Sequence, residues 1–371
     1  MKRFIIKTII MVIPVAIVIL YYSVAIEPHR NGDLGKLGFI AFDDEYDSLI
    51  SRITMDSLYV INIDNLEQID CDSAILTIGD SFSQQGEGGY QNYLATLYPG
   101  WRIYNYKPAE GVGDRYQIYI DMLIEDKPLP RIVILESVER ALASRLSNMR
   151  FDNHAKSNDE IGIPEETTKG SDSEFKTFVK KSKLYQLAKC LKENKEGLKT
   201  EFLNTQEYVK KYLDIDNPVK KTKLNSRLFS CKGSEDDLFF YYEDLNDVAE
   251  DTYKRSWQKL DTLLSIIEQK GICFIYLVAS DKYDLYKDFT VYDNYKVDGQ
   301  LDYYEKYNNS IKFLNCKTLL YPHIKRGEKD IYKCNDTHWS PIASRYVANE
   351  IKRRIELQKK YHCSSNCIDV Q

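Results

Sequence analysis

Four short runs rich in apolar residues alternate with helical patterns along much of the chain. The runs occupy residues 74–78, 102–106, 131–135 and 272–278. Apolar positions at helical spacing predict helices over residues 89–97, 116–124, 248–269 and 341–355. Short buried strands that alternate with helices are typical of a parallel sheet covered on both faces. We therefore predict an α/β fold with about five parallel strands.

The pattern is different at the N-terminus, where residues 8–26 carry no charge. A helix of this length just spans the hydrocarbon core of a bilayer. Lys2, Arg3 and Lys7 precede it, so the positive-inside rule predicts a cytoplasmic N-terminus and an extracytoplasmic remainder. A cleavable signal peptide is the alternative, because small residues surround position 25. We expect an uncleaved transmembrane anchor and a single-pass protein of the cell membrane.

The pattern changes again between residues 148 and 250, where strand signals become rare and charge rises. We interpret this region as a mostly helical insertion into one α/β domain. The predicted organisation is a cytoplasmic tail (1–7), a signal anchor (8–26), a linker and lead-in (27–70), a first domain part (71–147), the insertion (148–250), a second domain part (251–357) and a C-terminal tail (358–371).

Net charge and cysteine content restrict the partners, disulfides and metal sites that can be expected. The net charge of −5 gives no reason to expect nucleic acid as a partner. Eight cysteines are compatible with disulfides in an exported domain, although Cys273 lies inside an apolar run and is expected to be a buried thiol. Cys363 and Cys367 next to His362 lack a fourth ligand and a zinc-site spacing, so a local disulfide or two thiols is favoured and no metal site is predicted.

Candidate chemistry begins at G-D-S-F, residues 79–82, directly after the first apolar run. A serine at a strand-to-helix turn exposes its hydroxyl, and the helix start directs backbone N–H groups towards a developing oxyanion. Gly79 permits the tight turn, and Ser81 stands where the helix begins. The alternative is that Asp80 and Ser81 only cap that helix.

The second candidate segment is N-D-T-H-W-S, residues 335–340. Asp336 is placed to accept a hydrogen bond from Nδ1 of His338, which leaves Nε2 available to a serine. Trp339 is expected to pack beside the imidazole. A partly buried histidine satisfied by its neighbour is the alternative, and Asp152-x-His154 shows the same spacing in the polar insertion. Together the two segments predict a Ser81–His338–Asp336 triad with Ser81 Oγ hydrogen-bonded to Nε2.

G-D-S-F and D-T-H-W resemble the SGNH-hydrolase-like domains of polysaccharide O-acetyltransferases, the alginate O-acetyltransferase family. Three further segments resemble that family: V-I-L-E-S-V-E-R (133–140), L-V-A-S-D-K-Y-D-L-Y (277–286) and I-Y-K-C-N-D-T-H-W-S (331–340). The resemblance covers about residues 72–140 and 248–354. In the alginate enzymes D-T-H-W precedes G-D-S, whereas here the order is that of SGNH esterases, and the SGNH block asparagine is not identifiable.

The resemblance implies a three-layer α/β/α SGNH-like fold in which Ser81 accepts an acetyl group. His338 would act as general base and then acid, and Asp336 would orient it. The implied oxyanion donors are the N–H of Ser81 and that of Gly111 or Gly113. Implied substrate-positioning residues are Asp80, Glu136, Arg140, Lys282, Tyr286 and Trp339, of which Glu136 and Arg140 are interpreted as a structural or substrate-positioning pair.

The expected function is extracytoplasmic O-acetyl transfer to a cell-surface or exported polysaccharide through an acetyl-serine. This route needs no metal or organic cofactor. The resemblance implies a multi-span membrane O-acyltransferase as the partner that delivers acetyl groups. Two alternatives remain: a glycan O-acetyl esterase with the same triad, and a non-catalytic glycan-binding or assembly protein.

Overall fold

The structure is a computed structural model of the chain. It describes residues 13–14, 32–38, 40, 42, 44–69, 73–109, 113–151, 218–292, 295 and 299–366, the last six without their side chains. Most of the predicted anchor lies outside these residues, as do residues 152–217 of the insertion, the Asp152-x-His154 pair and Gly111. Within the described ranges, no helix combines the length and the apolarity that crossing a membrane requires.

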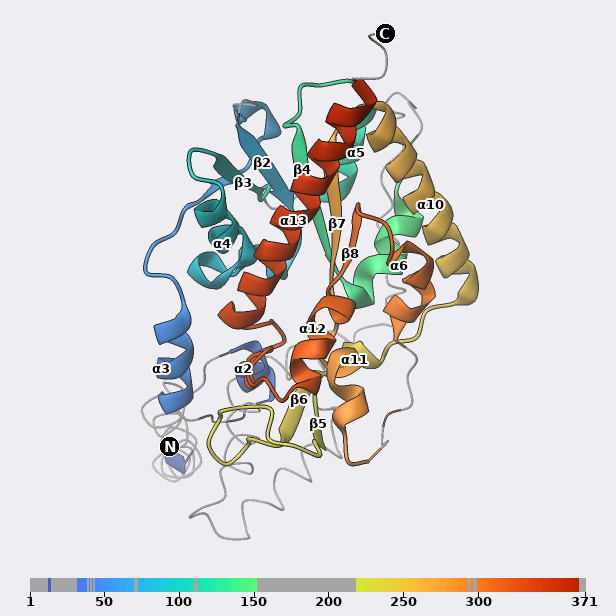
Figure 1. Ribbon diagram of the computed structural model, residues 1–371. Coiled ribbons are helices and arrows are strands. Elements are labelled where there is room, and N and C mark those ends of the chain that lie inside the picture. Colours follow the sequence, from blue (N-terminus) through green and yellow to red (C-terminus); the bar gives the residue numbers. More distant parts are fainter. Residues whose placement is uncertain are drawn as a thin grey trace, which may run out of the picture.

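A six-stranded parallel sheet forms the centre of the molecule (Figure 1). Its strands, in spatial order, are β1 (Val60–Ile63), β3 (Arg102–Tyr106), β2 (Ala74–Ile78), β4 (Ile132–Val138), β7 (Cys273–Ala279) and β8 (Phe313–Asn315). The predicted parallel α/β sheet is confirmed. The sequence prediction missed β1 and β8, which are short edge strands without a long apolar run.

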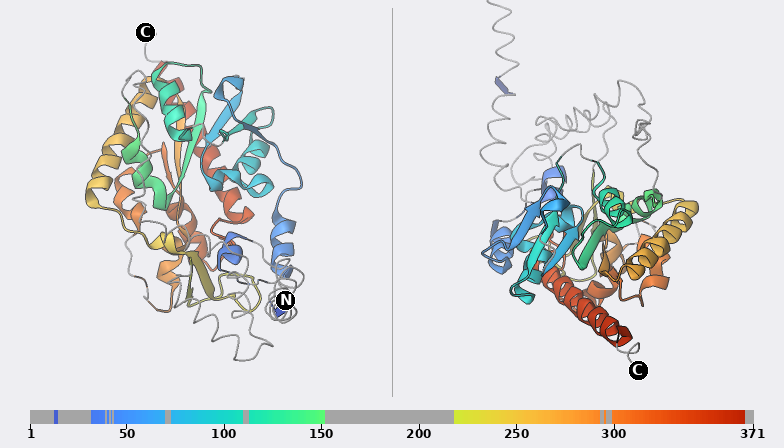
Figure 2. Two further views of the ribbon diagram at one scale, coloured as in Figure 1. Left: turned by 180° about the vertical axis from the view of Figure 1, so that it is seen from behind. Right: turned by 90° about the horizontal axis from the view of Figure 1, so that it is seen from above.

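Helices cover both faces of this sheet, which gives three layers (Figures 1 and 2). The helices on one face are α4 (Tyr90–Leu97), α12 (Cys316–Lys325) and α13 (Pro341–Asn366). Those on the other are α5 (Arg115–Ile124), α6 (Glu139–Asn148) and α10 (Glu250–Gln269). Successive residues of a strand serve opposite layers: Ile75 packs with the first set and Leu76 with the second. Helix α13 extends well into the predicted C-terminal tail.

The predicted lead-in and the described end of the insertion are more regular than the sequence indicated. The lead-in contains α2 (Asp33–Gly38), α3 (Asp44–Ile53) and β1. The described end of the insertion is an antiparallel hairpin of β5 (Val219–Lys223) and β6 (Asp237–Tyr241), followed by a 3₁₀ turn, Tyr242–Leu245. Strand β5 has the sequence V-K-K-T-K. Because three of its five residues are lysines, it shows no apolar run, and the sequence analysis did not predict it. In Figure 1, α2, α11 (Lys282–Tyr286) and this hairpin gather at the lower end of the molecule, where α13 begins.

The connections create a switch point between β2 and β4. From β2 the chain crosses to β3 on one side, and then returns to β4 on the other side of β2. In open α/β sheets the crevice at such a point, beyond the carboxyl ends of the strands, is the usual ligand site. Ser81 begins the 3₁₀ helix that follows β2, so the candidate nucleophile lies at this end of the sheet, as predicted.

Candidate active site

The turn after β2 exposes Ser81. Asp80 caps the short helix Ser81–Gln84 by accepting a hydrogen bond from Phe82 N (3.2 Å), and the Ser81 side chain is exposed. Only glycine fits at position 79, because a Cβ there would lie 2.2 Å from Ser83 Oγ and 2.3 Å from Glu136 Oε2. Asp80 therefore performs the capping that the alternative interpretation assigned to both residues, and the Ser81 hydroxyl is left facing solvent.

Two carboxyl groups, the buried Glu136 and the partly buried Asp80, support this turn. Glu136 Oε2 accepts hydrogen bonds from Asp80 N and Ser83 Oγ, both at 2.9 Å. Burial and the neighbouring Asp80 charge raise the pKa of Glu136 well above its usual range. Burial opposes ionisation of Asp80, yet the Arg145 guanidinium 2.7 Å away lowers the pKa of that carboxyl. Burial thus favours the protonated form of Glu136, whereas Arg145 favours the ionised form of Asp80.

This arrangement predicts an unusual pH dependence of stability for Glu136→Gln. Because the folded-state pKa of Glu136 is raised, its stabilising contribution is present below the unfolded value of about 4.3 and is lost as the pH rises. Glutamine keeps an acceptor oxygen and does not titrate. We expect the stability of Glu136→Gln relative to wild type to increase as the pH rises from 5 to 8. Urea unfolding at several pH values measures this difference.

The control for that experiment is Glu356→Gln, at a side chain that is 60% exposed. It should show no pH-dependent difference from wild type. A constant difference between Glu136→Gln and wild type across the pH range would contradict a neutral Glu136.

The second half of the site is the loop that carries His338. Asp336 Oδ1 lies 2.6 Å from His338 Nδ1 and also accepts from the His338 backbone N–H at 3.1 Å. Burial opposes its ionisation, but the hydrogen bond to His338 and the nearby Lys333 ammonium hold the pKa of Asp336 well below its usual range. Asp336 is therefore an ionised partner that fixes the imidazole with Nε2 directed away from it.

The two halves meet, but without the predicted hydrogen bond. The Phe82 ring, next to Ser81, lies 4.8 Å from the His338 ring between centroids. His338 Nε2 has no hydrogen-bond partner within the described residues, so the expected bond from Ser81 Oγ is not formed. The Ser81 turn and the His338 loop thus lie together at one end of the sheet, but the Ser81 hydroxyl and the His338 imidazole form no hydrogen bond.

Three predicted substrate-positioning residues are buried at the His338 loop: Lys282 and Tyr286, which contact it, and Trp339, which belongs to it. Lys282 is fully buried, and its ammonium donates to the backbone oxygens of Lys333 (2.7 Å), Cys334 (3.1 Å) and Asp336 (3.0 Å). Burial lowers the pKa of Lys282 to about 8, so it is charged at neutral pH. Its three N–H groups hold the loop from inside the protein.

Tyr286 and Trp339 are also buried. The Tyr286 hydroxyl accepts from Tyr332 N (3.2 Å), and the Trp339 ring packs edge-on against Phe82 with centroids 4.7 Å apart. In this structure these side chains contact protein groups, as Lys282 does, so their effect on a substrate would be exerted through the position of His338.

The E-x-x-E-R element, residues 136–140, spans the end of β4 and the start of α6 and joins several loops at the same end of the sheet. Glu136 supports the Ser81 turn, whereas Arg140 donates to Asp281 (2.6 Å) and Asp244 (3.3 Å). Glu136 and Arg140, interpreted as a structural or substrate-positioning pair, thus contact different partners and support different loops. Glu139, which the prediction did not select, is fully buried and accepts from Asp281 N (2.8 Å). Its position as the second glutamate of the E-x-x-E-R motif was the sequence signal by which it could have been identified.

The predicted oxyanion donors are only partly described. Gly113 is exposed and has a φ of +116°, a conformation that favours glycine. Two residues later, Arg115 donates to the backbone oxygen of Gly79, which brings the start of α5 to the Ser81 turn. Gly113 is thus near in sequence to a residue that contacts the turn, and its N–H as an oxyanion donor stays a prediction, as does the N–H of Ser81.

One acidic residue of the site was missed entirely. Asp33 Oδ2, from α2, lies 3.7 Å from His338 Nδ1. Candidate ligand atoms of Asp33, Asp336 and His338 all lie within 4.8 Å of one another, the one group of three in the described part of the chain with the spacing of a metal site. The imidazole Nδ1 of His338 in this group is already hydrogen-bonded to Asp336. No sequence pattern marks Asp33, since 303 positions separate it from Asp336.

The cysteines that the structure describes with their side chains are buried thiols. They are Cys231, Cys273, Cys316 and Cys334. The prediction for Cys273 is confirmed, and the expectation of disulfides does not hold for these four. The side chains of the other cysteines lie outside the described residues.

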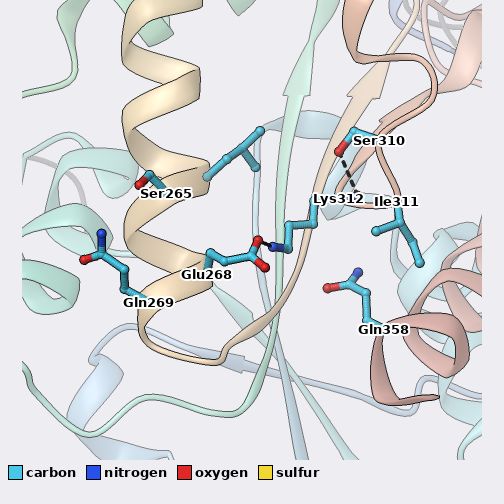
Figure 3. A pocket seen from close by; sticks show the side chains of 8 residues that line it. Ser265, Glu268, Gln269, Ser310, Ile311, Lys312 and Gln358 are labelled. Atoms are coloured by element: carbon cyan, nitrogen blue, oxygen red, sulfur yellow. Dashed lines mark hydrogen bonds and ion pairs between the residues drawn. The ribbon is translucent and has the colours of Figure 1, made fainter. Parts of the chain in front are cut away.

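A cavity of about 580 Å³ lies at the opposite end of the sheet, between the end of α10 and the start of β8 (Figure 3). Two of its polar contacts are between protein groups: Lys312 contacts Glu268, and the Gln358 amide bonds both N and O of Phe274. Its place at the opposite end of the sheet separates it from the Ser81–His338 region.

Searches for similar proteins give no further identification. No family model, curated protein or solved structure matches this chain. The assignment of a function therefore depends on the motifs and on the geometry described above.

Proposed function

We propose that this protein is an extracytoplasmic O-acetyltransferase that modifies a cell-surface or exported polysaccharide through an acetyl-Ser81 intermediate. The observation that supports this most directly is the Asp336–His338 pair, with a 2.6 Å contact, beside an exposed serine at the switch point of the sheet. The proposal places the chain among SGNH-like polysaccharide O-acetyltransferases, in line with its motifs.

In the proposed reaction Ser81 Oγ attacks the carbonyl carbon of an acetyl donor while His338 Nε2 takes its proton. Ionised Asp336 stabilises the imidazolium that forms. The developing oxyanion would be bound by the N–H of Ser81 and a second backbone donor near Gly113. The leaving group departs with the proton from Nε2. A sugar hydroxyl then gives its proton to Nε2, attacks acetyl-Ser81, and leaves as the acetyl ester while the proton returns to Ser81.

A membrane partner fits the predicted anchor. Asp33 in α2 is hydrogen-bonded to the His338 loop, and residues 27–31 alone separate the predicted anchor end, Ile26, from Gly32. Six extended Cα–Cα steps span at most about 21 Å. An uncleaved anchor would therefore hold the site close to the membrane surface, where a multi-span O-acyltransferase would supply acetyl groups.

An O-acetyl esterase is the second candidate. The exposed Ser81 side chain favours it, because water that reaches an acetyl-serine hydrolyses it. A non-catalytic glycan-binding protein is the third candidate, and the missing hydrogen bond between Ser81 and His338 favours that one. Transfer to oligosaccharide acceptors, measured against hydrolysis of the same donor, separates the first two.

The test of the proposal is intact mass after incubation with p-nitrophenyl acetate. We expect a covalent acetyl adduct on the wild-type chain, located at Ser81, and its loss in Ser81→Ala. One exposed hydroxyl contributes little to stability, so this variant should fold normally. Ser144→Ala, at an exposed helix serine, is the matched control and should keep the adduct. An adduct that persists in Ser81→Ala, or no adduct on wild type, would favour the glycan-binding alternative.

A further inference from the structure

The described residues between 32 and 47, here called the N-terminal brace, contact the His338 loop. Tyr46 OH accepts from Cys334 N (2.9 Å), and Asp47 Oδ1 accepts from Asn335 Nδ2 (3.0 Å). Gly35 N donates to Asn335 O (3.1 Å). These contacts join residues almost 300 positions apart in the sequence, so part of the predicted linker is built into the candidate active site.

The backbone of the N-terminal brace also packs closely against the His338 loop. At Gly32, a Cβ would lie 2.1 Å from Asn335 O, and the φ of +73° also favours glycine. The brace backbone therefore lies directly against the loop two residues after Lys333 and three before His338. A larger residue at position 32 could not be accommodated without moving the loop.

Asp33 reaches the loop nearest to the imidazole. Its Oδ1 accepts from Thr337 N at 2.7 Å, and its Oδ2 accepts from the Thr337 hydroxyl. Both donors belong to the residue between Asp336 and His338, so Asp33 fixes the peptide that sets the direction of the ring. The 3.7 Å distance from Oδ2 to His338 Nδ1 adds a second negative group to that of Asp336.

The charges around Asp33 are mixed. Asp336 and His338 are its nearest charged or titratable neighbours, Lys333 lies 3.7 Å from Asp336, and buried Lys282 and Asp244 also interact electrostatically with it. Burial and the Asp336 charge raise the pKa of Asp33 to about 6, although 35% of its side chain is exposed.

We propose that Asp33 is a positioning residue of the active site: it holds the His338 loop through Thr337 and supplies a second carboxylate that stabilises the imidazolium. The inference rests on the proposed function for its kinetic test. It makes the N-terminal brace, and not only the α/β domain, part of the catalytic unit.

The experiment compares Asp33→Asn, Asp33→Ala and the control Asp47→Ala in the full chain, with p-nitrophenyl acetate as the probe. We expect Asp33→Ala to lower kcat by about 10- to 100-fold with little change in KM, the range of a lost supporting contact. Asp33→Asn removes the charge, so the acid limb of its pH–rate profile should move to lower pH by roughly 0.5–1 unit. Asp47→Ala, which also loses a bond to the loop, should leave that limb in place.

An unmoved acid limb in Asp33→Asn, or the same shift in Asp47→Ala, would reduce Asp33 to a purely structural contact. A second readout is independent of activity: NMR titration of ¹³C-labelled histidine in the full chain, with the His338 signal assigned by His338→Gln. If the midpoint pH of the His338 titration is lower in Asp33→Asn than in wild type, the inference holds. It holds even when Ser81→Ala keeps its acetyl adduct and the proposed function fails. An unchanged midpoint overturns the inference whatever the adduct shows.

Discussion

Replacing His338 with alanine is expected to lower acetyl transfer from an activated ester by about 10³- to 10⁶-fold, as much as Ser81→Ala. Without the imidazole, Ser81 loses the base that takes its proton in the proposed reaction. Because serine and base act as one unit, the double variant should lose little more than either single one. Asp336→Asn should lose about 10²- to 10⁴-fold, since Nδ1 then lacks the carboxylate that fixes its tautomer. Initial rates of p-nitrophenol release measure all four proteins.

The chain contains a matched control for this series. His323 also has a carboxylate partner, with Nδ1 2.8 Å from Glu328 Oε2, but it lies in α12. His323→Ala should keep wild-type rates. Equal losses in His323→Ala and His338→Ala would attribute the effect to folding, and full activity of His338→Ala would remove the triad altogether.

Lys282→Met is expected to have the largest effect on stability among single changes in this region. Methionine retains most of the side-chain volume but removes three N–H donors from the carbonyls of Lys333, Cys334 and Asp336. Each buried acceptor left without a partner costs about 1–3 kcal/mol, partly offset because a buried charge is also removed. We expect a net loss of about 2–5 kcal/mol in the free energy of unfolding, measured by urea denaturation at pH 7.

Two further variants make that result interpretable. Lys254→Met, at an exposed helix ion pair, should leave the free energy of unfolding close to that of wild type. Tyr286→Phe removes only the acceptor of Tyr332 N, so it should lose about 1 kcal/mol and remain folded if Lys282→Met does not. Faster amide hydrogen exchange at residues 332–339 in either buried-site variant would locate the effect in the loop. Unchanged stability of Lys282→Met would contradict the role of this ammonium.

The sequence by itself determined the parallel sheet, the strand that leads to Ser81, and the Asp336–His338 pair. These features depend on short-range information. A continuous apolar run predicts a strand buried on both faces, as β2 and β7 are. Asp336 and His338 are two positions apart, so local geometry alone brings their side chains together. The edge strand β1 and the lysine-rich β5 lack such runs and were missed.

Only the tertiary structure decided what supports the site. Asp33 meets Thr337 across 304 positions, Lys282 reaches carbonyls more than 50 positions away, and Glu139 meets Asp281 across 142. Periodicity indicates which face of an element is buried, but it does not identify the partner that a buried charge will find. The same limit explains why the separate partners of Glu136 and Arg140 and the unformed Ser81–His338 hydrogen bond were not foreseen. Those distances are set by how the loops beyond β2, β4 and β7 pack together, and no single segment of the sequence contains that information.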